Sequence, residues 1–93
     1  MKTIHKFGLP LIGPQKVIMN VGAEILHVAM QGNIITIWAK VDVDNPMCHR
    51  VFNVYGTGWE LADTGKHVAT LLVDQFVWHV FDDGEIQIRP KES

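Results

Sequence analysis

The residues of this sequence best suited to acid–base chemistry are its five histidines. They are His5, His27, His49, His67 and His79, each on a separate predicted strand. An imidazole titrates near neutral pH, so histidines that converge in the fold can act as acid, as base or as a phosphate contact. No two of them have the close spacing of a helical metal motif, and one cysteine cannot build a structural zinc site. The sequence therefore predicts no metal site and no cofactor, with most histidines as ordinary strand residues.

One class of histidine chemistry can be compared directly with the spacing. The two-histidine phosphoesterases carry paired His-x-Ser/Thr motifs. Here His67-Val68-Ala69-Thr70 has one residue too many, and His79-Val80-Phe81 lacks the hydroxyl. The sequence therefore disfavours that class, and it leaves open a different metal-independent phosphodiesterase that uses a histidine pair as acid and base.

The segment Tyr55-Gly56-Thr57-Gly58-Trp59 combines features of a ligand-binding loop. Two glycines around Thr57 let the backbone approach a ligand closely, and successive amides could form a nest for an anion. Tyr55 and Trp59 could stack on a base or another planar ring. No strand–loop–helix pattern follows, so the segment is neither a Rossmann fingerprint nor a P-loop. The alternative is a glycine-rich strand connection whose aromatic residues cap the core.

A third motif, Asp63-Thr64-Gly65, resembles the active-site triplet of the aspartic proteases, in which two carboxylates share a proton. It lies two-thirds along the chain, whereas the short viral enzymes carry it in the first third. The apolar-apolar-glycine segment expected downstream is also absent. A turn is favoured instead, since Asp accepts backbone hydrogen bonds and Gly supplies a positive φ.

Composition limits the classes of protein to which the chain can belong. With 93 residues and 47% hydrophobic residues, it is too apolar for a disordered tail and too short for two cores. Eight Lys and Arg against ten Asp and Glu leave no basic stripe for duplex nucleic acid. The single Cys48 cannot form an intramolecular disulfide, and no apolar run is long enough for a signal peptide or a membrane span. We expect a single domain, residues 1–93, in the cytoplasm and away from membranes.

The elements that must position these residues are short strands, because β-branched and aromatic runs alternate with turn residues throughout. Two-residue turns are expected at Gly32-Asn33 and Asp74-Gln75, and Asp83-Gly84 is expected to turn the chain into a last strand. The sequence predicts an all-β fold, a small antiparallel β-sandwich or barrel of about seven or eight strands. The expected strands are Thr3–Gly8, Lys16–Val21, Glu24–Met30, Ile34–Asp42, Cys48–Tyr55, His67–Val73, Phe76–Phe81 and Glu85–Arg89.

Alternation along the strands predicts which side chains enter the core. The inward sets are Ile35, Ile37, Ala39 and Val41, then Leu26, Val28 and Met30, and then Cys48, Phe52 and Val54. The run Phe76–Phe81 is apolar on both sides. In so small a chain, this predicts that another copy covers one of the two sides, and we therefore expect a homo-oligomer.

Three segments, taken together, carry a resemblance to a family. They are Trp38-Ala39-x-Val41-Asp42, Arg50-x-Phe52-x-Val54-Tyr55-Gly56-Thr57-Gly58 and Val77-Trp78-His79-Val80-Phe81. From about Thr3 to Phe81 the chain resembles a family of short, uncharacterised proteins encoded by tailed bacteriophages. The resemblance carries over no catalytic residue. It implies a setting in which small oligomeric proteins blunt host defences, some of them by binding cyclic nucleotide signals between protomers.

The functional expectation is a phage-encoded binding protein that sequesters a nucleotide-like small molecule and so counters host defence. Aromatic side chains would stack on the base, glycine-loop amides with Arg50 or Lys66 would meet the phosphate, and a histidine would assist. The alternatives are a phosphodiesterase that cleaves such a signal and an inhibitor that binds a host protein through exposed aromatic residues. The candidate ligand-binding residues are Trp38, His49, Arg50, Tyr55, Gly56, Thr57, Gly58, Trp59, Lys66 and His67.

Overall fold

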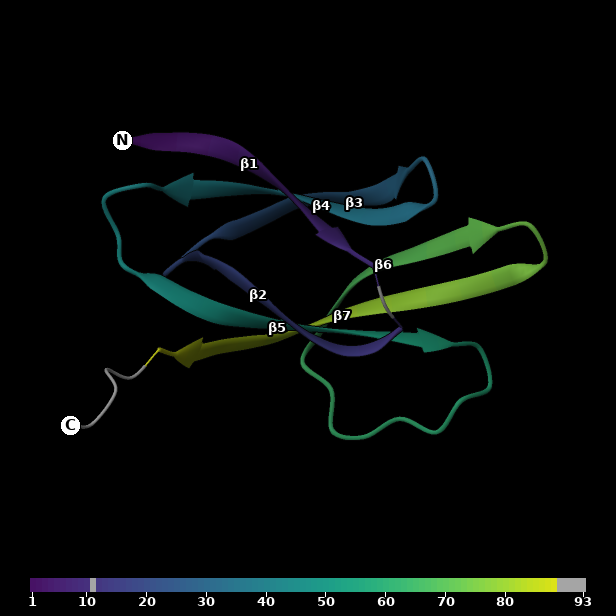
Figure 1. The fold of residues 1–93 in the computed structure, drawn as a ribbon. Helices are drawn as coiled ribbons and strands as arrows, with labels where there is room; N and C mark the ends of the chain where they lie inside the picture. The colour runs from purple at the N-terminus through teal and green to yellow at the C-terminus, as the bar shows by residue number, and fades with distance from the viewer. Residues whose placement is uncertain (11, 89–93) are drawn as a thin grey trace.

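The computed structural model describes residues 1–10 and 12–88, which fold into seven strands in two sheets (Figure 1). The strands are β1 (Lys2–Leu9), β2 (Gly13–Asn20), β3 (Glu24–Gln31), β4 (Ile34–Asp42), β5 (Met47–Gly56), β6 (Lys66–Val73) and β7 (Phe76–Gln87). A three-stranded sheet has the order β1-β4-β3, and a four-stranded sheet has the order β2-β5-β7-β6. All pairings are antiparallel, so the expected all-β fold is confirmed as a small sandwich.

Two hairpin turns lie where the sequence predicts them. Gly32 and Asn33 connect β3 to β4, and Gly32 has a φ of 61°, which glycine adopts without steric cost. Asp74 and Gln75 connect β6 to β7, with Asp74 at a φ of 53°. Asp is among the few non-glycine residues that tolerate this region. Each turn fixes the register of the hairpin that it closes.

The expected break at Asp83-Gly84 is wrong. The two expected strands Phe76–Phe81 and Glu85–Arg89 form one strand, β7, as far as Gln87, and Arg89 lies outside the described residues. The pairing with β5 runs from Phe52↔Asp82 to Val51↔Gly84, so Asp83 is an extra residue in a β-bulge. A bulge bends a strand without ending it, and Gly84 supplies the positive φ of 94° there.

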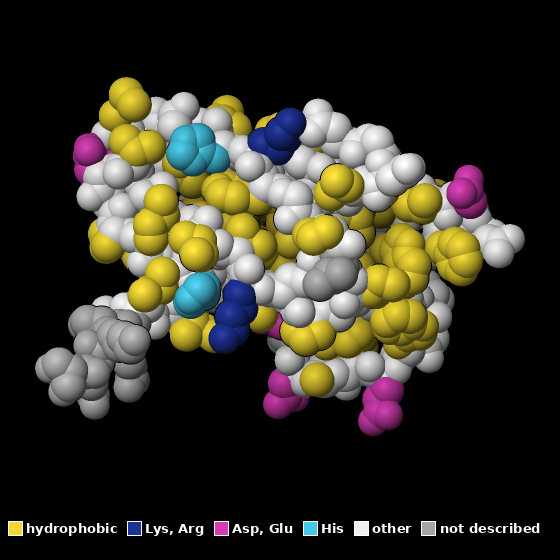
Figure 2. Space-filling model, in the orientation of Figure 1, with side chains coloured by type: hydrophobic (Ala, Val, Ile, Leu, Met, Phe, Trp, Pro, Cys, Tyr) yellow, Lys and Arg dark blue, Asp and Glu magenta, His cyan; other side chains and the backbone are white. Residues whose placement is uncertain are grey.

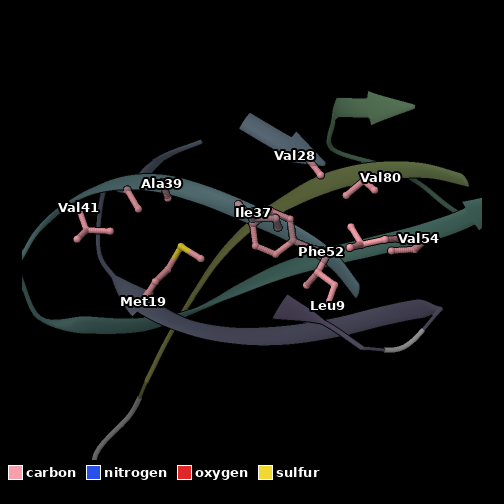
Figure 3. Close-up of a cluster of buried hydrophobic side chains, with 11 residues drawn as sticks. Leu9, Met19, Val28, Ile37, Ala39, Val41, Phe52, Val54 and Val80 are labelled. Atoms are coloured by element: carbon pink, nitrogen blue, oxygen red, sulfur yellow. The ribbon is translucent and has the colours of Figure 1, made fainter. Parts of the chain in front are cut away.

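The core lies between the two sheets and contains most of the side chains that alternation assigns to it (Figure 3). The inward sets of β4 and β5 are buried as expected. The fully buried Cys48 lies with its Sγ 3.3 Å from Glu85 Oε2. Burial, together with that hydrogen bond, raises the pKa of the Cys48 thiol to about 11. The protein therefore keeps Cys48 as a protonated core residue.

In the third inward set, Val28 and Met30 contribute to the core as expected, but Leu26 is wrong, because β3 also contains a bulge. Ile25 pairs with Ala39 and His27 with Trp38, so Leu26 is the extra residue. Leu26 is exposed, while Ile25 packs against the core in its place. The alternation of faces shifts by one residue at the bulge. Among the described residues there is also no helix of the length and apolarity needed to cross a membrane.

Candidate functional site

A bulge in β6 brings His67 and Thr70 to the same face of the four-stranded sheet. His67 pairs with Phe81 and Ala69 with Val80, so Val68 is the extra residue. In a regular strand, residues three apart point to opposite faces, and one additional residue reverses that relation. Val68, which makes the sequence one residue too long for a His-x-Thr motif, is therefore accommodated by the bulge. The Thr70 hydroxyl lies beside the His67 imidazole, with Thr70 Oγ1 2.9 Å from His67 Nε2.

Four side chains on this outer face form one continuous line of hydrogen bonds, which we call the His–Thr row. It consists of Thr57, His79, Thr70 and His67. Thr57 Oγ1 is 2.8 Å from His79 Nε2, and His79 Nδ1 is 3.1 Å from Thr70 Oγ1. The two imidazole ring centres lie 6.2 Å apart. Hydroxyl and imidazole groups alternate along the row, so it can both donate to and accept from a bound polar group.

The aromatic side chains of Phe81 and Tyr55 pack next to the row. The Phe81 ring lies edge-on to His67 at 5.3 Å and to Tyr55 at 5.8 Å. Tyr55 is buried, and its hydroxyl accepts a hydrogen bond of 3.0 Å from Asn53 Nδ2. Tyr55 is therefore a supporting residue whose ring is covered, and a base cannot stack on it as expected.

Thr57 also lines a pocket of about 400 Å³, the aromatic pocket, whose Phe76 and Trp78 side chains lie on the opposite face of β7 from His79. The pocket is lined by Gly56, Thr57, Trp59, Gln75, Phe76, Val77 and Trp78. The Phe76 and Trp78 rings stack at 5.9 Å, and Trp59 meets Trp78 edge-on at 5.6 Å. Trp59 and Phe76 remain about half exposed, at 49% and 52%. The pocket therefore offers accessible ring faces to a planar ligand.

Gly56 leaves room for the Trp59 ring, which lies over it. A Cβ at position 56 would lie 2.7 Å from the Trp59 ring. Trp59 N donates to Gly56 O at 3.2 Å, and Gly58 has a φ of 87°, which together make a type II turn. Thr57 N donates to Val77 O at 3.3 Å. The Thr57 amide, one of those expected to form a nest for an anion, therefore already has a backbone partner.

At the His67 end, the row reaches a cleft of about 380 Å³ between the edge strands β3 and β6, the edge cleft. Both strands carry their bulges here, at Leu26 and Val68, and both bulged residues line the cleft. The other lining residues are Ala23, Glu24, Ile25, His27, Val28, Arg50, Lys66, His67 and Asp82. The cleft therefore brings together three of the expected ligand-binding residues, Arg50, Lys66 and His67.

Arg50, however, is fully engaged by the protein. Its Nε and Nη2 donate to the two Asp82 carboxylate oxygens at 2.9 and 2.7 Å, and its Nη1 donates to Ala23 O at 2.9 Å. Burial alone would raise the pKa of Asp82, but hydrogen bonds from Arg50 and from Gly84 N outweigh it and lower the pKa. Arg50 is thus a structural residue at the base of the edge cleft, with all three of its guanidinium nitrogens bonded within the protein.

Two further expected residues lie away from the row. Trp38 lies on the outer face of the other sheet, where its ring is 5.8 Å from that of His27. His49 lies toward the opposite end of β5, paired with Ile86, and its Nδ1 is shielded without a hydrogen-bond partner. The protease-like Asp63 is exposed in the loop between β5 and β6. Neither Trp38 nor His49 lines the aromatic pocket or the edge cleft.

Sequence reasoning missed two members of the row as site residues, His79 and Thr70. A signal for their pairing was present, because the predicted turn at Asp74-Gln75 fixes the register of the hairpin. Counting back from Val73↔Phe76 places Thr70 opposite His79. The position of His67 depends on the bulge at Val68, and alternation alone does not predict it.

Comparison with known proteins gives one result. The family model of a domain of unknown function, DUF7352, matches residues 1–89, and the chain belongs to this family. The match spans all seven strands and every residue of the row. No curated protein and no solved structure matches the chain.

Proposed function

We propose that this DUF7352 protein binds a nucleotide-like small molecule, with the phosphate on the His–Thr row and the base in the aromatic pocket. The observation that carries the proposal is the continuity of the site. Thr57 belongs to both the row and the pocket, and His67 belongs to both the row and the edge cleft. A ligand with a phosphate on the row and a planar group in the aromatic pocket would pass Thr57, the residue at which the two surfaces meet.

The base end is supported by the arrangement of the three aromatic rings. Trp59 comes from the loop after β5, whereas Phe76 and Trp78 come from β7, so the pocket has walls on two segments. Stacking on such rings contributes about 1–3 kcal/mol per base and does not require a specific base. Figure 2 shows hydrophobic side chains gathered at the right-hand end of the molecule, where the β6–β7 hairpin lies in Figure 1.

The phosphate end is supported by the donors of the row and by one nearby cation. Hydroxyl and imidazole groups donate to phosphate oxygens, and an imidazolium does so with charge assistance. Lys66 is exposed at the edge cleft, next to His67 in the chain. The chain carries a net charge of −2, so an anion must be held by these local groups and not by the overall field.

The proposal extends to the setting that the resemblance implies. The protein would act as a homo-oligomer in the cytoplasm of a bacterial host and withdraw a nucleotide-derived defence signal from its receptor. Two exposed apolar residues, Leu72 on β6 and Leu61 in the loop between β5 and β6, support contacts with a second copy. A second protomer there would cover the ligand and lengthen its residence on the protein.

Isothermal calorimetry tests the binding proposal. The probes are cyclic diadenylate and cyclic triadenylate in their 2′-deoxy forms. Thr70→Val removes the hydroxyl that joins the two imidazoles and keeps the shape of the side chain. We expect saturable heat for the wild-type protein and affinity about tenfold weaker for this variant, as for the loss of one hydrogen bond to a charged group.

The matched control is His5→Gln, an exposed histidine on β1 in the other sheet. It should bind as the wild type does. Absence of heat with both probes, or unchanged affinity in Thr70→Val, would contradict the proposal.

A further inference from the structure

The hydrogen bonds of the His–Thr row impose a direction on its protons. A threonine hydroxyl holds one proton, and a neutral imidazole holds one proton on either of its two nitrogens. Thr70 lies between both imidazoles, at 2.9 Å from His67 Nε2 and 3.1 Å from His79 Nδ1. When Thr70 donates to one imidazole and accepts from the other, every bond in the row points the same way.

The two directions leave the ends of the row in opposite states. In one, His67 Nδ1 is a free acceptor and the Thr57 hydroxyl donates outward. In the other, His67 Nδ1–H donates outward and Thr57 Oγ1 accepts. A proton taken up at His67 therefore converts the first state into the second and releases a proton at Thr57. The row always presents a base at one end and an acid at the other.

From this juxtaposition of two imidazoles joined through Thr70, we propose that the row is an acid–base relay that cleaves ribose phosphodiesters. The inference rests on the proposed function, because the same surface must first hold the phosphate. It names the substrate class as a diester with a free 2′-hydroxyl beside the phosphorus. The 2′-hydroxyl supplies an intramolecular nucleophile, and a well-oriented intramolecular attack is strongly accelerated.

The reaction balances without any further reactant. The 2′-oxygen attacks the phosphorus, and the new O2′–P bond forms as the P–O5′ bond breaks. His67 takes the proton of the 2′-hydroxyl at Nδ1. The proton displaced along the row leaves from the Thr57 hydroxyl to the departing 5′-oxygen. The products are a 2′,3′-cyclic phosphate and a free 5′-hydroxyl. The row ends in its reversed direction, and it returns to its starting state when His67 Nδ1–H gives a proton to water and Thr57 Oγ1 takes one from water.

The position of the row in the site is consistent with this step. The acid end at Thr57 borders the aromatic pocket, which would hold the base of the departing nucleoside. The base end at His67 borders the edge cleft, and Lys66, which lines that cleft, would offset the charge that develops on the phosphate oxygens. His67 and His79 touch the reacting atoms or transfer the proton, whereas Phe81 only positions the His67 ring.

The test follows the fate of cyclic diadenylate by chromatography in buffer with a chelator. We expect the wild-type protein to convert it to a linear isomer of the same mass that ends in a 2′,3′-cyclic phosphate, and then to 2′,3′-cyclic adenylate. His67→Gln and His79→Gln should each lower kcat about 100-fold, and His5→Gln should leave it unchanged. The rate of the wild-type protein should follow a bell-shaped pH profile that is lost in both variants.

The 2′-deoxy form of the probe separates this inference from the proposed function, because it can bind but cannot be cleaved. If the deoxy form binds but the ribose form is not cleaved, the relay is overturned and the binding function stays in place. Cleavage that persists in both histidine variants would also overturn it. Failure of the deoxy form to bind would overturn the proposed function itself. Melting temperatures within a few degrees of wild type should confirm that both variants are folded, as expected for substitutions on a solvent-facing sheet surface.

Discussion

At the scale of single residues, burial decides what a charged side chain can do. The sequence places Arg50 near the glycine loop, and a free guanidinium there would suit a phosphate. The structure gives Arg50 13% and Asp82 9% side-chain exposure, with two hydrogen bonds between them. Lys66, two residues before the bulge at Val68, remains exposed instead. The residue types thus indicated the chemistry correctly. Only the contact between Arg50 and Asp82 in the structure showed that Lys66 is the available cation.

The Arg50–Asp82 pair leads to a prediction on stability. Asp82→Asn removes two charge-assisted hydrogen bonds and leaves the buried guanidinium with Glu85, 3.6 Å from its Nη1, as its carboxylate partner, so it should lower the free energy of unfolding by about 2 kcal/mol. The matched control is Asp63→Asn, an exposed carboxylate in the loop before β6. Urea denaturation at pH 7 measures both variants. Equal stability of Asp82→Asn and wild type would contradict the structural role of the pair.

The same pair gives the prediction a pH dependence. The pKa of Asp82 is lowered in the folded protein from its ordinary value of 3.8. Its contribution is therefore complete above about pH 4 and is lost as the pH falls through the lower folded pKa. Urea midpoints of unfolding should be measured between pH 7 and pH 2. The difference in midpoint between wild type and Asp82→Asn should become smaller as the pH falls.

At the scale of elements, the strands and turns could be predicted, and the bulges could not. Runs such as Ile34–Asp42 show a clear period of two, and the Gly32-Asn33 turn has a recognisable residue pair. The bulged residues Leu26, Val68 and Asp83 have no such signature, because a bulge depends on the pairing strand. Each error of face or strand end in the prediction lies at one of these bulges.

The loop between β5 and β6 is tied to the sheet at Gly65. Gly65 N donates to Asp83 Oδ1 at 2.8 Å, and a Cβ at position 65 would lie 2.1 Å from Asp82 O. Because that neighbour is backbone, it cannot move aside as a flexible side chain would. Gly65→Ala should therefore lower the free energy of unfolding by about 2 kcal/mol.

Thermal denaturation followed by circular dichroism measures this effect. The matched control is Gly8→Ala, where the new Cβ would meet only the Ile34 side chain, at 3.3 Å. Gly8→Ala should change the melting temperature much less than Gly65→Ala. The reverse order would contradict the close approach of the loop to β7.

At the scale of the whole molecule, the expectation of a homo-oligomer remains a prediction. In the single chain, the outward side chains of β7, Val77, His79 and Phe81, are only partly covered. Leu72, on the neighbouring strand, is 78% exposed. A second copy packed on this end of the sheet would remove these side chains from water, at about 25 cal/mol per Å² of apolar area.

Light scattering during size-exclusion chromatography measures the assembly. We expect a mass that is a multiple of the 10.5 kDa of one chain. Leu72→Glu should shift the protein toward the monomer, and Ile4→Glu, on the outer side of the other sheet, should not. A mass of one chain at high protein concentration would contradict the oligomer.

The central claim is that one surface, the His–Thr row with its aromatic pocket, holds the phosphate of a nucleotide-like ligand. Its most direct test is nuclear magnetic resonance of the five imidazole rings during a titration with 2′-deoxy cyclic diadenylate. We predict saturable shifts of the His67 and His79 ring signals, with those of His5 and His27 unchanged. Shifts confined to His5 or His27, or no shift at any ring, would contradict the account.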